Sequence, residues 1–309
     1  MSSNGKALAT NKRSCPACGR SQGKARGSKY GFDLLTCNNC GTLYTPFMPE
    51  ATGAEVYDNW YDPESSTVSM PAFIHSRLDE IVGSFSPYRK TNLLLDVGCG
   101  AGALLQAAAR AGWDAEGQEI SRTGCEYIRG LGIRAYHGDL LEAKYPSDRF
   151  DVVTASEVLE HLPDPELYVR EIFRILRPGG LFWGTTPHGR GLSASLLGID
   201  WSVVGPPDHL QLFSTKGIKI LFAKSGFRRT RVLTQGMNPY EILEAWRKRR
   251  AANNAPADAE PAQPNFINER YNLNESFTKS PLRRTVKTAV NKMLSVSRQG
   301  DTLKIWAEK

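Results

Sequence analysis

The sequence predicts an α/β fold, in which one sheet is covered by helices on both faces and is preceded by a small metal-binding module. Two observations support this prediction. From residue 91 onward, strand-like segments alternate with helix-like segments, which is typical of a parallel sheet with helical crossovers. Ahead of them, four of the six cysteines fall within the first forty residues, as two Cys-x-x-Cys pairs.

Seven short segments are the predicted strands of the sheet. The first is an apolar run that ends in glycines, which is typical of a buried strand followed by a ligand-binding turn. The predicted strands are 92–97, 114–118, a short segment that ends at His137, 150–155, 181–186, 228–234 and 302–307.

Helix signals lie between these strands. Asp164 is a good N-cap residue, and Pro165 follows at the first helical position, where its missing N–H group does no harm. Ser214 caps a later helix, with Phe213 and Ile218 placed as a hydrophobic staple. The predicted helices are 71–86, 104–110, one that starts near Ser121, one from Asp164 to Leu176, one that starts at Ser214, and 282–294.

These elements divide the chain into consecutive regions. We expect a disordered basic tail (1–13), a cysteine module (14–50), a helical lid or linker (51–90) and an α/β domain (91–309). Two insertions interrupt the α/β domain, at 188–212 and at 237–300. The second insertion is helical, precedes the last strand and contains a linker-like run rich in Ala, Pro and Asn at 251–265.

The positive charge is concentrated at one end of the chain. The net charge is +7, yet residues 1–32 hold seven Lys or Arg and no acid, so the charges of the remainder balance. Nucleic acid is therefore not expected as a partner. No apolar run approaches the ~18 residues of a membrane-spanning helix, and the first residues lack the apolar stretch of a signal peptide. We expect a cytoplasmic protein, and the cysteine usage fits a reducing compartment.

The cysteine pairs predict a structural metal site. Cys15 and Cys18 are separated from Cys37 and Cys40 by eighteen residues, and a glycine follows each pair. Two thiolates at this spacing bind one ion from a tight turn, so two pairs make a closed, tetrahedral zinc site. A redox dithiol and an iron–sulfur site are the alternatives. With four cysteine ligands no coordination position stays open for catalysis, so we expect a role in folding and docking.

The strongest chemical signal is Asp96-Val97-Gly98-Cys99-Gly100-Ala101-Gly102, between a strand and a helix. Glycines there let the backbone approach a ligand, and Glu119 stands at the distance where a ribose is held. These features alone also fit a dinucleotide. The carboxylate of Asp96, however, would repel a pyrophosphate and suits a ligand with a cationic amino group. Asp139, after the third strand, can accept a hydrogen bond from an adenine amino group.

Further motifs follow, namely Phe150-Asp151-Val152-Val153, Glu157-Val158-Leu159-Glu160-His161-Leu162 and Leu176-Arg177-Pro178-Gly179-Gly180. With the glycine loop, they make residues 91–235 resemble the class I S-adenosylmethionine (SAM)-dependent methyltransferases. The branch it resembles most contains the ubiquinone-biosynthesis O-methyltransferases and many enzymes of glycan tailoring, and the cysteine module resembles a zinc ribbon.

The resemblance implies a Rossmann-like seven-stranded sheet and a set of residues that hold SAM. Gly98, Gly100 and Gly102 would lie along the methionine part, together with Asp96. Glu119 and Ile120 would lie at the ribose, and Asp139 and Leu140 at the adenine. Ser156 and Glu157 would border the methyl group, and Tyr57 and Tyr61 would belong to a lid. Packing of the lid against the core is the simpler role for the two tyrosines.

Methyl transfer often needs a base that removes the proton of the acceptor. His209 is the first candidate and His188 the second, with Asp208 beside His209 and Glu157 at the methyl donor. Each histidine could instead simply hydrogen-bond a loop. Glu157, Glu160 and His161 also match residues that bind a divalent cation in the ubiquinone O-methyltransferases. We favour a supporting role for Glu160 and His161 over a Mg²⁺ site, because a metal would need further ligands.

The favoured function is O-methylation of a small molecule or of a sugar or glycan precursor. Methylation of ribosomal or transfer RNA, with the zinc ribbon and the basic N-terminus as the RNA-binding part, is one alternative, and a non-catalytic SAM-binding scaffold is another. Two roles are predicted for the basic helix 282–294. It could rest against the core with its charges in solvent, or it could lie on an anionic membrane. The acceptor and the oligomeric state are not predicted.

Overall fold

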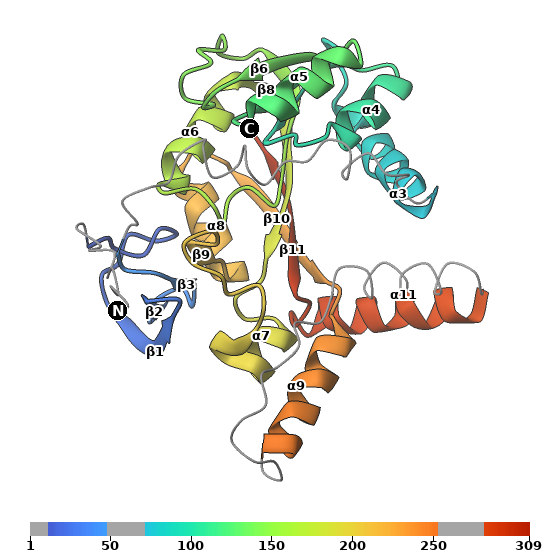
Figure 1. The fold of residues 1–309 in the computed structure, drawn as a ribbon. Coiled ribbons are helices and arrows are strands. Elements are labelled where there is room, and N and C mark those ends of the chain that lie inside the picture. Colours follow the sequence, from blue (N-terminus) through green and yellow to red (C-terminus); the bar gives the residue numbers. More distant parts are fainter. Residues whose placement is uncertain (1–11, 48–71, 253–280) are drawn as a thin grey trace, which may run out of the picture.

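The computed structural model describes residues 12–47, 72–252 and 281–309 (Figure 1). Residues 1–11 of the predicted basic tail, the lid residues Tyr57 and Tyr61, and most of the linker-like run at 251–265 lie outside the described residues. Arg13, the last residue of the predicted tail, is described and is hydrogen-bonded to the rest of the protein, so the prediction of disorder is wrong for it.

A seven-stranded sheet forms the body of the protein, as predicted. Its order is β10-β11-β8-β7-β4-β5-β6. The strands are β4 (Leu93–Val97), β5 (Asp114–Glu119), β6 (Arg134–His137), β7 (Phe150–Ser156), β8 (Leu176–Pro187), β10 (Arg229–Gln235) and β11 (Thr302–Glu308). The expectation of a parallel sheet is wrong for β11, which runs antiparallel to both β8 and β10. Strand β11 begins at the side of the sheet where β10 ends, and it runs back between β10 and β8 in the opposite direction.

Strand β8 is longer than predicted. It begins at Leu176, directly after α6, and runs through Pro178-Gly179-Gly180 without a break. Leu176 pairs with Phe150, and the register shifts between Phe150 and Val152. Pro178, Gly179 and Gly180, which usually interrupt regular structure, therefore lie in an irregular but continuous part of the strand.

Helices cover both faces of the sheet, in the order that the sequence predicts. They are α3 (Ala72–Gly83), η1 (Ser86–Tyr88), α4 (Ala103–Arg110), α5 (Arg122–Gly130), α6 (Pro165–Ile175) and α8 (Thr215–Lys224). The two predicted caps are present: the side chains of Asp164 and Ser214 accept hydrogen bonds from the first turns of α6 and α8. Ser121, near which a helix was predicted to start, caps α5 in the same way.

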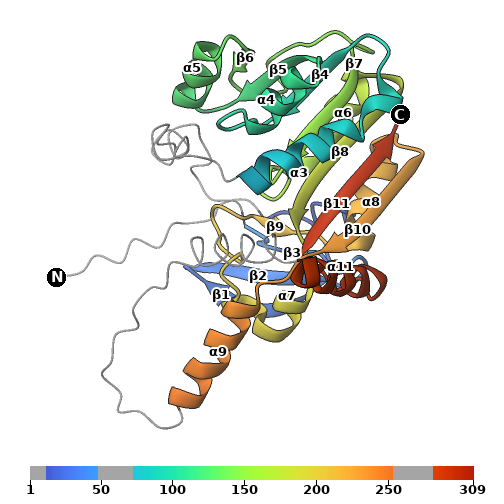
Figure 2. The same ribbon diagram turned by 90° about the vertical axis from the view of Figure 1, so that its right-hand side faces the viewer.

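Side-chain alternation along the strands separates two cores. Leu94 and Val152 face the core that contains α3, α4 and α5, whereas their neighbours Leu95 and Val153 face the core that contains α6 and α8. Figure 2 shows α3 lying across one face of the sheet.

The N-terminal residues 12–47, hereafter the ribbon, share a second sheet with the body. Strands β1 (Gly23–Lys29), β2 (Phe32–Cys37) and β3 (Leu43–Tyr44) are joined by β9 (Gln211–Leu212), which belongs to the first insertion. The same insertion contains α7 (Leu192–Leu197) and η2 (Gly198–Asp200). Figure 1 shows the blue ribbon strands beside β9. The ribbon and the insertion therefore form one structural unit.

The second insertion places α9 (Pro239–Ala252) and α11 (Pro281–Val296) between β10 and β11. Helix α11 packs against β10 near its C-terminal end, where Leu294 is buried. Within the described ranges, none of the helices has the length and apolar character needed to cross a bilayer.

Candidate functional site

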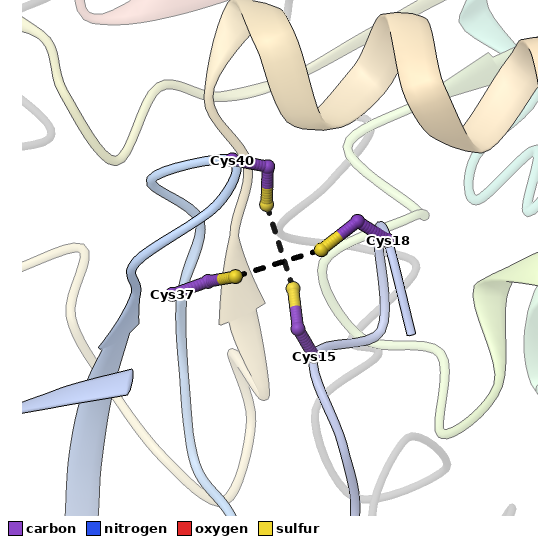
Figure 3. Close-up of side chains that lie close together, drawn as sticks. All are labelled: Cys15, Cys18, Cys37 and Cys40. Carbon is purple, nitrogen blue, oxygen red and sulfur yellow. Dashed lines mark hydrogen bonds between the residues drawn. The ribbon is translucent and has the colours of Figure 1, made fainter. Parts of the chain in front are cut away.

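Four cysteines converge between the ribbon and α8 (Figure 3). The Sγ atoms of Cys15 and Cys40 lie 3.5 Å apart, as do those of Cys18 and Cys37, and none of the four forms a disulfide. All four Sγ atoms lie within 4.8 Å of one another. A tetrahedral zinc ion with Zn–S bonds of about 2.3 Å requires S–S separations of about 3.8 Å, so the four thiols fit such an ion.

The glycines after each cysteine pair adopt the backbone that this arrangement needs. Gly19 and Gly41 have φ angles of +73° and +78°, in the left-handed region that other residues rarely adopt. The ribbon is also fastened to α8. Ser214 donates to the carbonyl of Cys40, and a Cβ atom at Gly217 would lie only 2.3 Å from Oγ1 of Thr42. The cysteine cluster is therefore buried against the body.

The ribbon also contacts the loop that follows β7. The guanidinium of Arg13 donates to the carbonyl oxygens of Thr45, Pro163 and Leu210 at 2.9, 3.0 and 2.8 Å. On the body side, Nε2 of Gln211 donates to the carbonyls of Leu159 and Leu162. Strand β9 thus lies between the ribbon and residues 157–162.

A cavity of about 710 Å³ lies at the carboxyl ends of β4 and β7. The glycine loop and the end of β7 form one part of its wall, including Asp96, Ser156 and Glu157. Helix α3, the start of α4, the end of β8, the start of β11 and the two insertions also contribute to the wall, which includes residues 201–203 and 236–238. A cavity at this edge of the sheet is where open α/β folds bind ligands.

The glycine loop forms a close-fitting turn beside the cavity. Gly98, Gly100 and Gly102 have φ angles of +62°, +52° and +70°. A Cβ atom at Gly98 would lie 2.6 Å from Cγ2 of Val158, so the backbone has no room for a side chain there. The three predicted glycines therefore meet a geometric requirement of this turn.

Asp96 is a buried carboxylate at the end of β4. It accepts a hydrogen bond of 2.6 Å from Oγ1 of Thr154. Burial raises the pKa of Asp96 to about 7, even though the hydrogen bond from Thr154 acts in the opposite direction. A cationic group in the cavity would favour the ionised carboxylate.

The predicted ribose and adenine residues lie at the neighbouring strand ends. Glu119 ends β5 and accepts hydrogen bonds from the backbone N–H groups of Gly100 and Ser121 at 2.8 and 2.9 Å. Ile120 follows it directly. Asp139 accepts from the N–H of Leu141 at 2.7 Å and from the hydroxyl of Tyr168, and Leu140 is buried. Glu119 thus stands beside the glycine loop and Asp139 follows the next strand, although neither carboxylate lines the described cavity.

Glu157 is the predicted catalytic side chain that lines the cavity. It is exposed, and its φ angle of +55° is unusual for a residue other than glycine. Strained backbone of this kind is often found where a side chain is aimed at a ligand.

A cluster of ionisable groups lies behind Glu157. Burial, and then the neighbouring carboxylate of Glu157, raises the pKa of Glu160 well above its usual range. Nδ1 of His161 lies 3.0 Å from Oδ1 of Asp208, and the rings of His161 and His209 meet edge to face with centroids 4.7 Å apart. Although burial raises it, the hydrogen bond from His161 holds the pKa of Asp208 below its usual value.

The two predicted histidine bases do not line the described cavity. His209 is oriented by a contact of 2.6 Å between its Nδ1 atom and the carbonyl of Val203, and burial lowers its pKa. His188 is buried elsewhere, with Nδ1 2.8 Å from the carbonyl of Gly300, and burial lowers its pKa to about 4. Glu157 thus lines the cavity directly, whereas His209 contacts the cavity wall through the carbonyl of Val203 and His188 follows the lining residue Pro187.

The structure changes the candidate set for a divalent cation. One ligand atom each from Glu160, His161 and His209 lie within 4.8 Å of one another, and Oε1 of Glu160 has no hydrogen-bond partner among the described residues. Two imidazoles with one carboxylate suit a transition metal better than Mg²⁺, which prefers oxygen ligands. The cluster therefore adds no support for magnesium.

Several cavity residues have no signal in the sequence. Ser202 and Val203 come from the first insertion, and Glu241 comes from the second. The carboxylate of Glu241 accepts a hydrogen bond of 2.6 Å from the N–H of Ser202, which joins the two insertions. Asp301 accepts from the N–H and hydroxyl of Ser193 at the start of α7. Such pairings over long sequence separations leave no local pattern.

A family model described as a methyltransferase domain matches residues 70–232. The ubiquinone biosynthesis O-methyltransferase of Methylococcus capsulatus is 37% identical over 149 residues, which are 45% of this chain and 61% of that protein. The same enzyme of Bordetella avium is 34% identical over 137 residues, 41% of this chain and 55% of that protein. The chain thus matches less than two thirds of each relative. A solved SAM-dependent methyltransferase from Archaeoglobus fulgidus aligns with a TM-score of 0.49 and 17% identity, over 76% of this chain and 94% of that chain.

Proposed function

The chain belongs to the methyltransferase-domain family, and we propose that it transfers the methyl group of SAM to a hydroxyl group of a small-molecule or sugar acceptor. The observation that carries this proposal is the buried carboxylate of Asp96 beside the tight glycine turn, at the wall of a cavity of about 710 Å³. This combination suits a ligand that is cationic and carries no phosphate. The relatives named as O-methyltransferases support oxygen as the acceptor atom.

The residues fit SAM along one edge of the sheet. Gly98 to Gly102 would lie against the methionine part with its amino group near Asp96, Glu119 would hold the ribose hydroxyls, and Asp139 and Leu140 would bind the adenine. When bound, SAM supplies an electrophilic methyl group on its sulfonium. Glu119 already accepts hydrogen bonds from two backbone N–H groups, so its carboxylate is held in place before the ribose binds.

Glu157 is the group that we propose to accept the proton of the acceptor hydroxyl. It lines the cavity, and the buried Glu160 behind it has a raised pKa. Asp208, His161 and His209 would orient this pair and take up charge. The role of His209 as the base itself, and that of His188, remain predictions that alanine variants can test.

We propose zinc as the ion of the four-cysteine site. Thiolates select soft or borderline ions, and four of them at tetrahedral spacing fit a closed structural zinc centre. Because this chemistry needs reduced thiols, the cytoplasm is the compartment that we propose.

Glu119→Ala tests the cofactor directly. Two charge-assisted hydrogen bonds to the ribose would be lost, so the dissociation constant of SAM should rise by about tenfold to a hundredfold. Isothermal calorimetry with SAM and S-adenosylhomocysteine measures this, and Glu116→Ala on the same strand is the control. Failure of the folded, zinc-loaded wild type to bind SAM would overturn the proposed function, and NAD would then be tested.

The binding of SAM should depend on pH through Asp96. Without ligand the pKa of Asp96 is about 7, and the cationic amino group of SAM needs the ionised form. The dissociation constant should therefore rise as pH falls below about 7, by up to about tenfold per pH unit. Asp96→Asn should bind SAM more weakly at neutral pH and lose this dependence. A wild-type affinity that stays constant between pH 5 and pH 8 would show that Asp96 does not pair with the cofactor.

A further inference from the structure

Helix α11 carries an apolar face that the described parts of the chain leave uncovered. Val286, Met293 and Val296 are 49%, 64% and 80% exposed. Positions 286, 289, 293 and 296 follow helical spacing and lie on one side of the helix. A shallow groove on this side is lined by Ala289, Met293 and Val296, with Lys292 at its border. These side chains are neighbours on one helix and form a contiguous apolar strip, unlike apolar residues that are scattered singly over a protein surface.

The C-terminal end of α11 is firmly anchored. Oγ1 of Thr234 donates to the carbonyl of Leu294 at 2.9 Å, and Oδ1 of Asn291 accepts from the N–H of Gly236 at 3.0 Å. The N–H of Leu192 donates to the carbonyl of Gln299 at 2.7 Å. From this anchor the helix extends away from the sheet (Figure 1). The apolar face is therefore held in a fixed orientation on a projecting helix.

The sequence around α11 is strongly basic. Residues 276–300 contain Lys279, Arg283, Arg284, Lys287, Lys292 and Arg298, and no acid. Residues 33–309 hold 32 basic and 32 acidic side chains in total, so the rest of this part of the chain carries an excess of acid while the segment around α11 carries none. An apolar strip within a purely basic segment is complementary to a surface that is apolar below and anionic above.

We propose that α11 binds the surface of a membrane that contains anionic lipids. The helix would lie in the plane of the interface, with Val286, Met293 and Val296 among the acyl chains and Lys292 and Arg298 at the headgroups. This goes beyond the methyltransferase activity, because lipid binding needs neither SAM nor an acceptor.

The position of the anchor gives the surface a functional meaning, which rests on the proposed function. Gly236 and Asp301, at the two ends of the second insertion, both line the cavity. Gly236 is also bonded to Asn291 of α11. A membrane-bound α11 would therefore hold the cavity close to the lipid surface, where an acceptor carried on a lipid can reach it.

Sedimentation of the full chain with vesicles tests this surface. One set of vesicles is phosphatidylcholine alone, and the other is an equal mixture of phosphatidylcholine and phosphatidylglycerol. Wild type should pellet with the mixed vesicles only, and about 0.5 M salt should weaken its binding. Met293→Glu combined with Val296→Glu should weaken binding by about tenfold or more. Lys292→Glu combined with Arg298→Glu should have an effect of similar size.

A matched control separates this surface from general exposure of apolar residues. Leu167 on α6 is 50% exposed, and Leu167→Glu should bind the mixed vesicles as wild type does. Wild type that stays in the supernatant with both kinds of vesicle would overturn the proposal, as would an equal loss in Leu167→Glu. A wild-type dimer that the Met293/Val296 variant converts to a monomer, without vesicle binding, would identify a second copy as the occupant and also overturn it. SAM binding, measured in parallel, reports separately on the proposed function.

Discussion

Loss of the zinc ion that we propose for the four-cysteine site should release residues 198–214 while leaving SAM binding nearly unchanged. In Cys40→Ser the cysteine cluster loses a ligand, and a closed zinc site contributes about 10 kcal/mol or more to the folding of a small module. Without the folded ribbon, β9 loses its partner β3, and Leu210 loses its bond from Arg13. Both contacts hold the segment that carries Asp208 and His209.

The measurement is hydrogen exchange of residues 198–214, together with the zinc content and calorimetry with SAM. Protection of this segment should fall, whereas the dissociation constant of SAM should change by no more than about threefold, which is below 1 kcal/mol. Turnover should fall by about a hundredfold, because small displacements of positioning groups are costly. Asn38→Ala, at an exposed position between two ligands, is the control. An equal loss of SAM affinity would mean that the ribbon supports the whole fold instead of the acceptor side.

Glu157→Gln should lower turnover by about a hundredfold to ten-thousandfold, the range for loss of a general base. The amide keeps the size of the side chain and its place at the cavity, so SAM affinity should stay close to that of the wild type. Methyl transfer to phenols and nucleotide sugars from an acceptor screen provides the assay. Glu142→Gln, on the exposed surface after β6, is the control.

His209→Ala, assayed in parallel, distinguishes the two candidate bases. If Glu157 takes the proton, the histidine variant should lose less activity than Glu157→Gln, since His209 acts through the cluster behind it. Turnover of Glu157→Gln within about threefold of wild type would retire Glu157 as the base. A larger loss in His209→Ala would then assign the role to the histidine.

Local chemistry made much of the fold predictable. The predicted caps at Asp164 and Ser214 are present because a side-chain oxygen satisfies nearby N–H groups in the first turn, which needs no tertiary context. The glycine loop was also predictable, because a backbone with no space for a Cβ atom, as at Gly98, requires glycine and so leaves a pattern in the sequence. The cysteine spacing likewise predicted that the four thiols converge, because each Cys-x-x-Cys pair forms a tight local turn.

Features that depend on distant pairing could not be predicted in this way. The antiparallel direction of β11 depends on which neighbours the strand finds, and strand propensity is the same in either direction. The cavity wall at Ser202 and Glu241 joins two insertions that are far apart in the sequence. The contacts of Arg13 with Pro163 and Leu210 span 150 and 197 positions, so no periodicity reveals them.

The pairing of β3 with β9 limits how the ribbon can be transplanted. Leu43 and Tyr44 need Leu212 and Gln211 as partners, and Leu34 and Leu43 share an apolar cluster with Leu197 and Leu212. A ribbon grafted onto another α/β body would expose an unpaired strand edge together with Leu34 and Leu43 of that cluster, which favours aggregation. The ribbon and the first insertion are thus a single exchangeable part, and a chimera that takes one must take the other.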